Sequence, residues 1–315
     1  MINILFCSNS STLSKNITSS LSKYELNIIN ANINRFNDGE VAVEVLSNVR
    51  EQSVFVVQSS THKPNDDLME LLITIDALKR ASARKIIAVI PYFYYARQDR
   101  KSHPRSPITA KLCADLIQTA GADSVITMDL HVSQIQGFFN IPVDNIYYWP
   151  SVINHIKENF FVGEGLVITS PDVGGVVRAR SLAKRISAQM VIIDKRREKA
   201  GQSEVMNIIG DVKGKDCIIT DDILDSGGTL CNAALALKNN GAKSVCAYIT
   251  HGLFSGSAID KIEKSSLDFV AISDTVDNEA KIATSTKIKL ISASEIFADV
   301  INEFSSGGSV SKLFD

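Results

Sequence analysis

One segment of the sequence combines acidic, hydroxyl and glycine residues in an order that suits a phosphorylated sugar. An apolar run from Cys217 ends in Asp221 and Asp222, and an acid, a hydroxyl, two glycines and a second hydroxyl follow at 225–229 before a helical pattern begins. Glycines let backbone N–H groups turn toward an anion, and a helix N-terminus adds partial positive charge. The pattern therefore predicts phosphate at 225–229 and sugar hydroxyls at the aspartates. The plainer interpretation is an acidic strand end before a capped helix.

Two basic segments indicate contacts with further phosphates. Lys195 and Arg197 follow the apolar run 190–193, and the next stretch, 198–204, has no apolar anchor. We expect a mobile loop that closes over phosphates and excludes water; a solvated basic loop is the alternative. Arg97 and Gln98 follow an aromatic strand end suited to the wall of a cleft, and an arginine can pair with phosphate oxygens through two N–H groups.

Any kinase chemistry in this chain must use an unusual nucleotide site. Residues 210–215 come closest to a Walker A loop, but they have one residue too few between the glycines and no Ser or Thr after the lysine. A protein-kinase glycine loop is also absent from the sequence.

The elements that position these residues alternate between strands and helices. Such alternation predicts parallel sheets with helices on both faces. Predicted strands are 2–7, 54–58, 86–90, 125–128, 166–169, 190–193, 216–220, 244–249 and 269–273, and predicted helices are 66–83, 108–120, 173–187, 228–239 and 258–262. The Ser/Gly-rich stretch 305–311 is typical of a terminal tail.

A repeat at an offset of 120 residues indicates two domains of one fold. Thr109, Gly121 and His131 recur as Thr229, Gly241 and His251, within a shared unit of helix, Gly-Ala turn, strand and histidine. We predict an internal duplication, with an N-terminal domain at 1–148 and a C-terminal domain at 149–315. Chance similarity between two units of one structural class is the alternative. His251 lacks a partner motif and is expected to be structural.

Composition excludes several classes of protein. Among 315 residues, 33 Lys and Arg balance 35 Asp and Glu, so the basic footprint of a nucleic-acid-binding protein is missing. Five cysteines without a C-x-x-C pair argue against a disulfide framework or a zinc ribbon. The N-terminus does not resemble a signal peptide, and the densest apolar run, 86–96, is too short for a membrane span. We expect a cytoplasmic protein without nucleic-acid or membrane partners.

The segment 217–229 resembles the phosphoribosyl pyrophosphate (PRPP) loop of type I phosphoribosyltransferases. A narrower resemblance, to ribose-phosphate pyrophosphokinases of the phosphate-activated class, runs from the first strand to the serines near the C-terminus. It is carried by residues 36–40, 95–100, 107–112, 129–131, 134–139, 171–178 and 194–197. The resemblance implies two tandem type I phosphoribosyltransferase-like domains, the first on the ATP side and the second holding ribose 5-phosphate. It also implies transfer of the diphosphoryl group of ATP to the sugar 1-hydroxyl.

The resemblance assigns roles to individual residues. Catalytic positions are Lys195 and Arg197, and Mg²⁺-associated positions are His131 and Asp172. ATP-binding positions are Phe36, Asp38, Gly39, Glu40, Arg97 and Gln98, of which the first four come from a neighbouring subunit. Ribose 5-phosphate positions are Arg197, Asp221, Asp222, Asp225, Ser226, Gly227, Gly228 and Thr229. Taken alone, residues 37–39 are simply a turn signal.

Regulation and assembly also follow from the resemblance. It implies a homohexamer in which phosphate activates and ADP inhibits at a subunit-interface site. The matching positions are Ser47, Arg50, Ser82, Arg84, Ser309 and Ser311. Asn48, the order Arg84-Lys85 and the loop 102–104 depart from the usual pattern and weaken this assignment.

Three other functions compete with an active diphosphokinase. A non-catalytic PRPP-synthetase-associated regulatory homologue would keep the fold, but the positions His131, Asp172, Lys195 and Arg197 are all intact here. A nucleobase phosphoribosyltransferase would need one such domain and no ATP-side residues. A PRPP-sensing repressor would need a basic nucleic-acid-binding segment, which the sequence lacks.

Overall fold

The computed structural model describes residues 1–8, 12–60, 62–196 and 205–315, with 195, 196, 205 and 206 described by their backbone alone. The chain divides into two compact units. Unit 1 comprises Met1–Tyr148, Asp274–Asp277 and Ser292–Asp315, and unit 2 comprises Trp149–Ser273 and Asn278–Ile291. The predicted domain boundary between residues 148 and 149 coincides with the first boundary between the units, but residues 292–315 lie in unit 1. The division into domains at 1–148 and 149–315 therefore stays a prediction.

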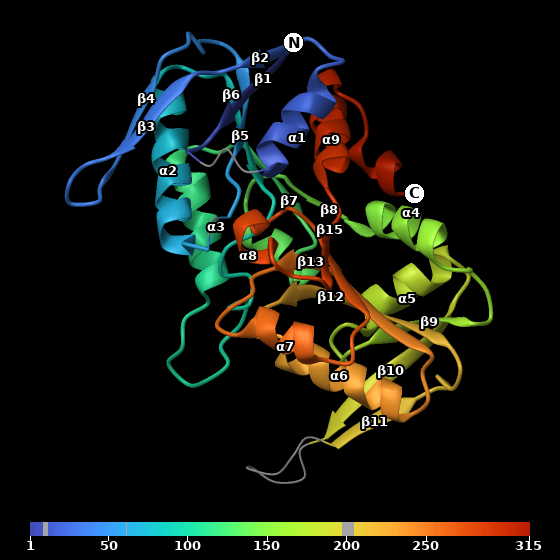
Figure 1. Ribbon diagram of the computed structural model, residues 1–315. Helices are drawn as coiled ribbons and strands as arrows, with labels where there is room; N and C mark the ends of the chain where they lie inside the picture. The colour runs from blue at the N-terminus through green and yellow to red at the C-terminus, as the bar shows by residue number, and fades with distance from the viewer. Residues whose placement is uncertain (9–11, 61, 197–204) are drawn as a thin grey trace. The chain divides into compact units, whose positions relative to one another are not determined.

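Unit 1 is built on a parallel sheet in the order β2-β1-β5-β6-β7-β8. The strands are β1 (Ile2–Phe6), β2 (Leu26–Ile28), β5 (Ser53–Val57), β6 (Lys85–Ile90), β7 (Ser124–Met128) and β8 (Val143–Ile146). Helix α1 (Thr12–Leu21) packs beside α9 (Ser294–Ser306), and α2 (Pro64–Arg80) packs beside α3 (Thr109–Ala120) (Figure 1). The crossover through α1 leads from β1 to one side of the sheet, and the crossovers through α2 and α3 lead to the other side. Because such crossovers are right-handed, α1 and α9 lie on one face of the sheet and α2 and α3 on the opposite face.

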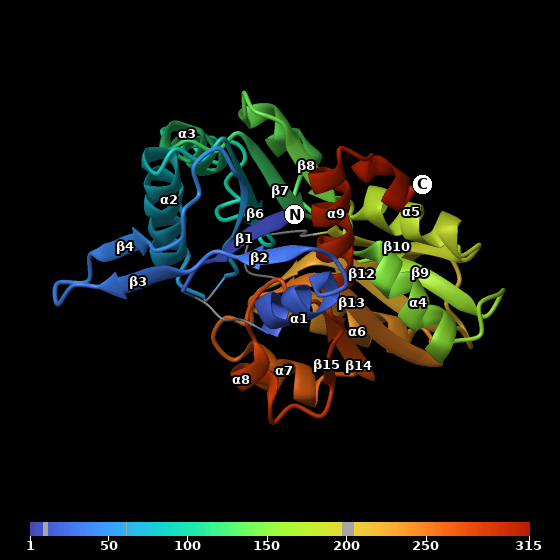
Figure 2. The same ribbon diagram turned by 90° about the horizontal axis from the view of Figure 1, so that it is seen from above.

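A hairpin outside that sheet projects from unit 1. Strands β3 (Ala31–Arg35) and β4 (Val41–Val45) pair antiparallel, and β4 packs against α2 (Figures 1 and 2). The turn signal at 37–39 is confirmed, because Gly39 adopts φ +97°, which favours glycine.

Unit 2 repeats the plan in the order β11-β10-β9-β12-β13-β14-β15, with only β11 antiparallel. The strands are β9 (Leu166–Ser170), β10 (Gln189–Arg196), β11 (Val205–Ile209), β12 (Asp216–Leu224), β13 (Ser244–Gly252), β14 (Phe269–Ile272) and β15 (Ile288–Leu290). The helices are α4 (Trp149–Asn159), α5 (Val176–Arg185), α6 (Gly228–Asn239), α7 (Ala258–Lys264) and α8 (Glu279–Ile282). The predicted α/β class with parallel sheets is confirmed.

The two strand orders correct the predicted register of the repeat. Each unit places its first strand beside its second and then continues outward, so β12 corresponds to β5, β13 to β6 and β14 to β7. The 120-residue offset instead matched α3 and β7 with α6 and β13, which is one strand–helix unit out of step. Helix, glycine turn and buried strand recur in successive crossovers, and a local pattern does not show which crossover it matches.

The C-terminal segment is also corrected. Residues 294–306 form α9, whose Phe297, Val300 and Ile301 are fully buried, and a short 3-10 helix, η2, spans Val310–Phe314. The ring of Phe314 contacts Tyr147 edge-on. The serines and glycines at 305–311 thus form a helix end and a turn, where Gly307 adopts φ +72°.

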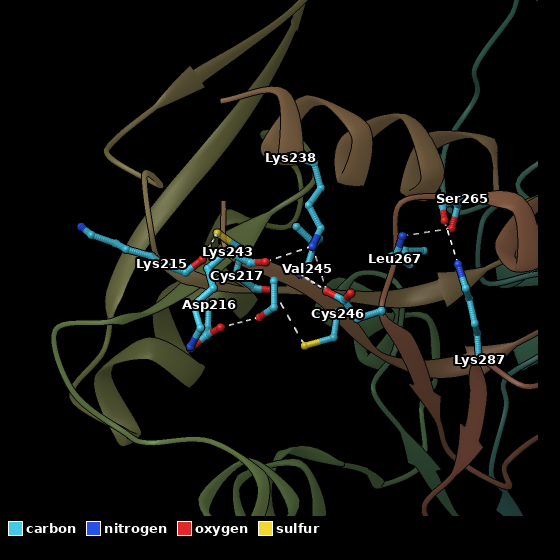
Figure 3. A network of polar contacts seen from close by, with 12 residues as sticks. Lys215, Asp216, Cys217, Lys238, Lys243, Val245, Cys246, Ser265, Leu267 and Lys287 are labelled. Carbon is cyan, nitrogen blue, oxygen red and sulfur yellow. Dashed lines mark hydrogen bonds and ion pairs between the residues drawn. The ribbon is translucent and has the colours of Figure 1, made fainter. Parts of the chain in front are cut away.

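The central strands are buried on both faces, as expected for parallel sheets. Their amino ends in unit 2 are joined by a surface network of charges (Figure 3). Asp216 accepts hydrogen bonds from Ser244 Oγ at 2.6 Å and Lys243 Nζ at 3.0 Å, and Lys238 Nζ lies 3.1 Å from Asp268 Oδ2. This network lies at the opposite end of the strands from the acidic segment at 221–229. Among the described residues, no helix is both long and apolar enough to cross a membrane.

Candidate functional site

The acidic residues of unit 2 converge at the carboxyl edge of its sheet. Strands β9 and β12 are parallel neighbours, so their carboxyl ends open at the same edge. Asp172 follows β9 by two residues, while Asp221 and Asp222 lie near the carboxyl end of β12. Ligands of open α/β sheets bind at such carboxyl ends.

Arg178 connects the two adjacent carboxylates, although no role was predicted for it from the sequence. Its Nη1 lies 3.2 Å from Asp221 Oδ1 and 3.1 Å from Asp222 Oδ1. Arg178 is on the first turn of α5, which follows β9, so the helix presents a cation to the neighbouring strand. The only signal in the sequence was its place at the end of the 171–178 motif.

The environment of Asp221 raises the pKa of this carboxyl. Burial, and then the negative charge of Asp222, raise the pKa of Asp221 to about 7. The positive charge of Arg178 lowers the pKa of Asp221, and the negative charge of Asp172 raises it further. A cation close to the pair would act like Arg178 and lower the pKa of Asp221.

Asp172 lies in the turn between β9 and α5. Its Oδ1 accepts a hydrogen bond from the N–H of Gly175 at 2.9 Å, and its carbonyl accepts one from Ser170 Oγ at 2.6 Å. The side chain is half-buried. A carboxylate fixed in this way at a strand end is suited to hold a hydrated cation.

The predicted phosphate loop connects β12 to α6. Gly227 adopts φ +75°, and a side chain at Gly228 would meet open space. The N-terminus of α6 has no side-chain cap and no acid in its first turn. The first turn of this helix is therefore suited to an anion, and phosphate binding there stays a prediction.

The corresponding loop of unit 1 is built differently. It leads from β5 into α2, whose first turn begins at Pro64 and carries Asp66 and Asp67. Proline removes one N–H donor, and the acids already offset the positive end of the helix. The start of α6 in unit 2 is therefore better suited to phosphate than the start of α2 in unit 1.

The ATP-side residues predicted in unit 1 occupy two places. Phe36, Asp38, Gly39 and Glu40 form the β3–β4 turn, where Phe36 is 61% exposed and Asp38 Oδ1 accepts the N–H of Glu40 at 3.1 Å. Arg97 and Gln98 are exposed beyond β6, and Gln98 Oε1 accepts a hydrogen bond from Thr109 Oγ1 at 2.5 Å. A shared ATP site built from the two places stays a prediction.

His131 is half-buried just beyond β7 in unit 1, whereas Asp172 is in unit 2. Within the described ranges, no group of three or more His, Cys, Asp or Glu side chains is arranged to hold a metal ion. The metal role of these two residues stays a prediction. His251 is buried within β13, as a structural histidine would be.

The predicted effector positions all lie in unit 1, and two of their segments adjoin. The N–H of Glu51 bonds to the carbonyl of Ser82 at 2.9 Å, which connects the turn with Ser47 and Arg50 to the turn with Ser82 and Arg84. Ser309 Oγ and Ser311 Oγ lie 2.9 Å from each other. Anion binding by these residues remains untested.

The remaining catalytic predictions fall at or beyond the end of β10. The backbone of Lys195 pairs with Met206 across the β10–β11 ladder, but its side chain is not described. Arg197 and the loop 198–204 lie outside the described residues.

Comparisons with known proteins cover the full length of the chain. Residues 2–121 match the family model described as the N-terminal domain of ribose phosphate pyrophosphokinase, and residues 184–315 match a phosphoribosyl synthetase-associated domain. The Brucella melitensis ribose-phosphate pyrophosphokinase is 54% identical over 313 residues, which is 99% of each chain. The Granulibacter bethesdensis enzyme of that name is 51% identical over 312 residues, again 99% of each chain. The crystal structure of phosphoribosylpyrophosphate synthetase from Mycobacterium smegmatis superposes with a TM-score of 0.90 at 35% identity, covering 98% of this chain and all of the other.

Two similar, mainly parallel sheets, with an acidic and glycine-rich loop at the carboxyl edge of one, define an α/β protein built from two units of one plan. The full-length relatives narrow this class. The chain belongs to the ribose-phosphate pyrophosphokinase family.

Proposed function

We propose that this chain transfers the diphosphoryl group of ATP to the 1-hydroxyl of ribose 5-phosphate, giving PRPP and AMP for nucleotide biosynthesis. The observation that carries the proposal is the carboxyl edge of β12. There an aspartate pair held by Arg178 precedes the last two residues of β12 and the loop 225–227, and the uncapped start of α6 follows that loop. A site for the phosphate at the start of α6 therefore lies close in the chain to carboxylates that can accept hydrogen bonds from sugar hydroxyls. A sugar phosphate requires both.

Ribose 5-phosphate binds with its phosphate at 225–229 and its hydroxyls at Asp221 and Asp222. The N–H groups of the loop and the hydroxyls of Ser226 and Thr229 hold the phosphate oxygens. Asp225 belongs to the same turn, and Arg197 adds positive charge from beyond β10. In this orientation the sugar 1-hydroxyl is the nucleophile that faces the triphosphate.

ATP binds to residues of unit 1, with the adenine at the β3–β4 turn of a neighbouring copy and phosphates at Arg97 and Gln98. Exposed Phe36 offers a ring face for stacking on the base, and the carboxylates of Asp38 and Glu40 are acceptors for its amino group. Arg97 pairs with phosphate oxygens.

Mg²⁺ suits the oxygen donors of this site. Asp172 offers a half-buried carboxylate that would hold the ion, and His131 would be its second protein contact, directly or through water. When bound with ATP, the ion neutralises charge on the transferring phosphates. Lys195 stabilises the charge that develops on the transferred group, so its contribution is to kcat.

We also propose that the chain assembles as a homohexamer, so that the β3–β4 turn completes the site of another copy. Phosphate and ADP are the proposed effectors, at the positions around Ser82 and Arg84. ATP and a sugar phosphate are cytoplasmic metabolites, which supports the expected location. Sedimentation alongside assay tests the assembly: a dilute monomer with full activity would contradict it.

Phosphorus NMR of the protein with ATP, Mg²⁺ and ribose 5-phosphate tests the reaction. AMP together with a pyrophosphorylated sugar supports the proposal, and the Lys195→Ala variant should form both far more slowly. Formation of ADP would show a different phosphoryl transfer. An absence of turnover with intact binding would favour the regulatory homologue instead.

A further inference from the structure

Three successive carbonyl groups where β12 leads into the phosphate loop, those of residues 224–226, accept hydrogen bonds from one segment, 253–261, which follows β13. The carbonyl of Leu224 accepts the N–H of Leu253 at 2.7 Å, and the carbonyl of Asp225 accepts the N–H of Ser255 at 3.1 Å. The carbonyl of Ser226 accepts Lys261 Nζ at 3.2 Å. Three successive peptide groups are therefore held from the same side.

This pattern determines where the amide donors of the loop point. In a trans peptide the C=O and the following N–H point in opposite directions. The carbonyls of residues 224–226 point toward the segment 253–261. The N–H groups of residues 225–227 therefore point away from it. Those N–H groups are the donors required by an anion at the start of α6.

Helix α7 supports the loop at close range. It packs beside α6 (Figure 1), and its first residue, the buried Ala258, lies beneath Gly227. A Cβ built on Gly227 would lie 3.5 Å from the carbonyl oxygen of Ala258. Lys261 follows one turn later on the same helix and supplies the only charged group among these supports.

We propose that Lys261 is a positioning residue for the 5-phosphate of the sugar substrate. Its ammonium fixes the Ser226 carbonyl and thereby aims the N–H of Gly227 at the phosphate. Its positive charge also adds to the potential of an anion site that has no acid in the first turn of α6. This inference rests on the proposed function and assigns Lys261 no part in ATP binding or in the transfer step.

The test compares three variants of the full chain. Lys261→Gln removes the charge, Lys261→Arg retains it, and Lys264→Gln removes an exposed charge from the same helix as a matched control. For Lys261→Gln we expect the KM for ribose 5-phosphate to rise about tenfold, the effect of losing one charged hydrogen bond. Its kcat and KM for ATP should stay near wild-type values, because Lys261 is assigned only to the sugar phosphate.

Rescue and binding measurements complete the experiment. Lys261→Arg should recover most of the affinity, and Lys264→Gln should match wild type. Calorimetric titration with ribose 5-phosphate should show the same loss for Lys261→Gln, while thermal unfolding checks that the variant is folded. Equal changes in both KM values, or a Lys261→Gln variant that matches Lys264→Gln, would overturn the inference alone. A wild-type chain that neither binds the sugar phosphate nor makes PRPP would overturn the proposed function instead.

Discussion

Arg178 is the residue on which the acidic edge of β12 depends. Its guanidinium lies within 3.2 Å of two carboxylates that would otherwise repel each other; the side chain of Asp222 is buried and that of Asp221 is 25% exposed. Removing one partner of a buried ion group is costly because the remaining charge loses its compensation. The raised pKa of Asp221 shows how close this carboxyl already is to the neutral state.

Replacing Arg178 should destabilise the chain in a pH-dependent way. We expect Arg178→Gln to lower the free energy of unfolding by about 3 kcal/mol at pH 8, where both carboxylates are ionised. The native pKa of Asp221 is raised from 3.8 to about 7, so its protonated form favours folding at low pH and that contribution is lost as the pH rises through 7. The penalty should therefore be smaller at pH 5.

Urea unfolding of metal-free protein at the two pH values measures this difference. Arg180→Gln, an exposed arginine on the same helix, is the control and should change stability little at either pH. A penalty that is the same at pH 5 and pH 8 would show that Asp221 does not titrate as inferred.

At the scale of elements, the β3–β4 hairpin depends on a buried acid in α2. Glu70 accepts hydrogen bonds from the N–H and Oγ of Ser8, each at 2.7 Å, and lies 3.7 Å from the guanidinium of Arg35 at the end of β3. One carboxylate thus connects the end of β1, helix α2 and the hairpin that carries Phe36.

Replacing Glu70 should loosen that connection. We expect Glu70→Gln to cost about 2–3 kcal/mol of unfolding free energy, because a buried charged acceptor is lost. Arg35→Met should cost less, since Arg35 is 41% exposed. Chemical denaturation measures both, with Arg80→Met as the control: Arg80 pairs with Asp76 at the surface, where ion pairs contribute at most about 1 kcal/mol. If Glu70→Gln were no worse than this control, Glu70 would not be an anchor of the hairpin.

At the scale of the whole molecule, the C-terminus completes unit 1. Helix α9 packs beside α1, and its Phe297, Val300 and Ile301 are fully buried. Burial of three such side chains contributes roughly 5–9 kcal/mol, which is comparable to the stability of a whole domain.

Truncation tests this assignment. Deleting residues 292–315 should unfold unit 1 and abolish activity, whereas deleting only 308–315 leaves α9 in place and should preserve a cooperative transition. Calorimetry and limited proteolysis distinguish the outcomes. A truncated chain at 1–291 that keeps a protected unit 1 would show that α9 is dispensable.

Local patterns in the sequence predicted the α/β class and nine of the fifteen strands in the described residues, because alternating apolar runs and glycines at a helix start act over a few residues. They missed the edge strands β2, β8, β11 and β15, the β3–β4 hairpin, and the helices α1, α4, α8 and α9. Tertiary structure decided what depends on contacts between distant segments. Arg178 lies 43 residues from Asp221, and Lys261 reaches a carbonyl 35 residues away, so neither role is visible in local spacing. The register of the repeat and the place of α9 likewise emerge only when strands pair and helices pack, since identical local units are distinguished by their neighbours in space.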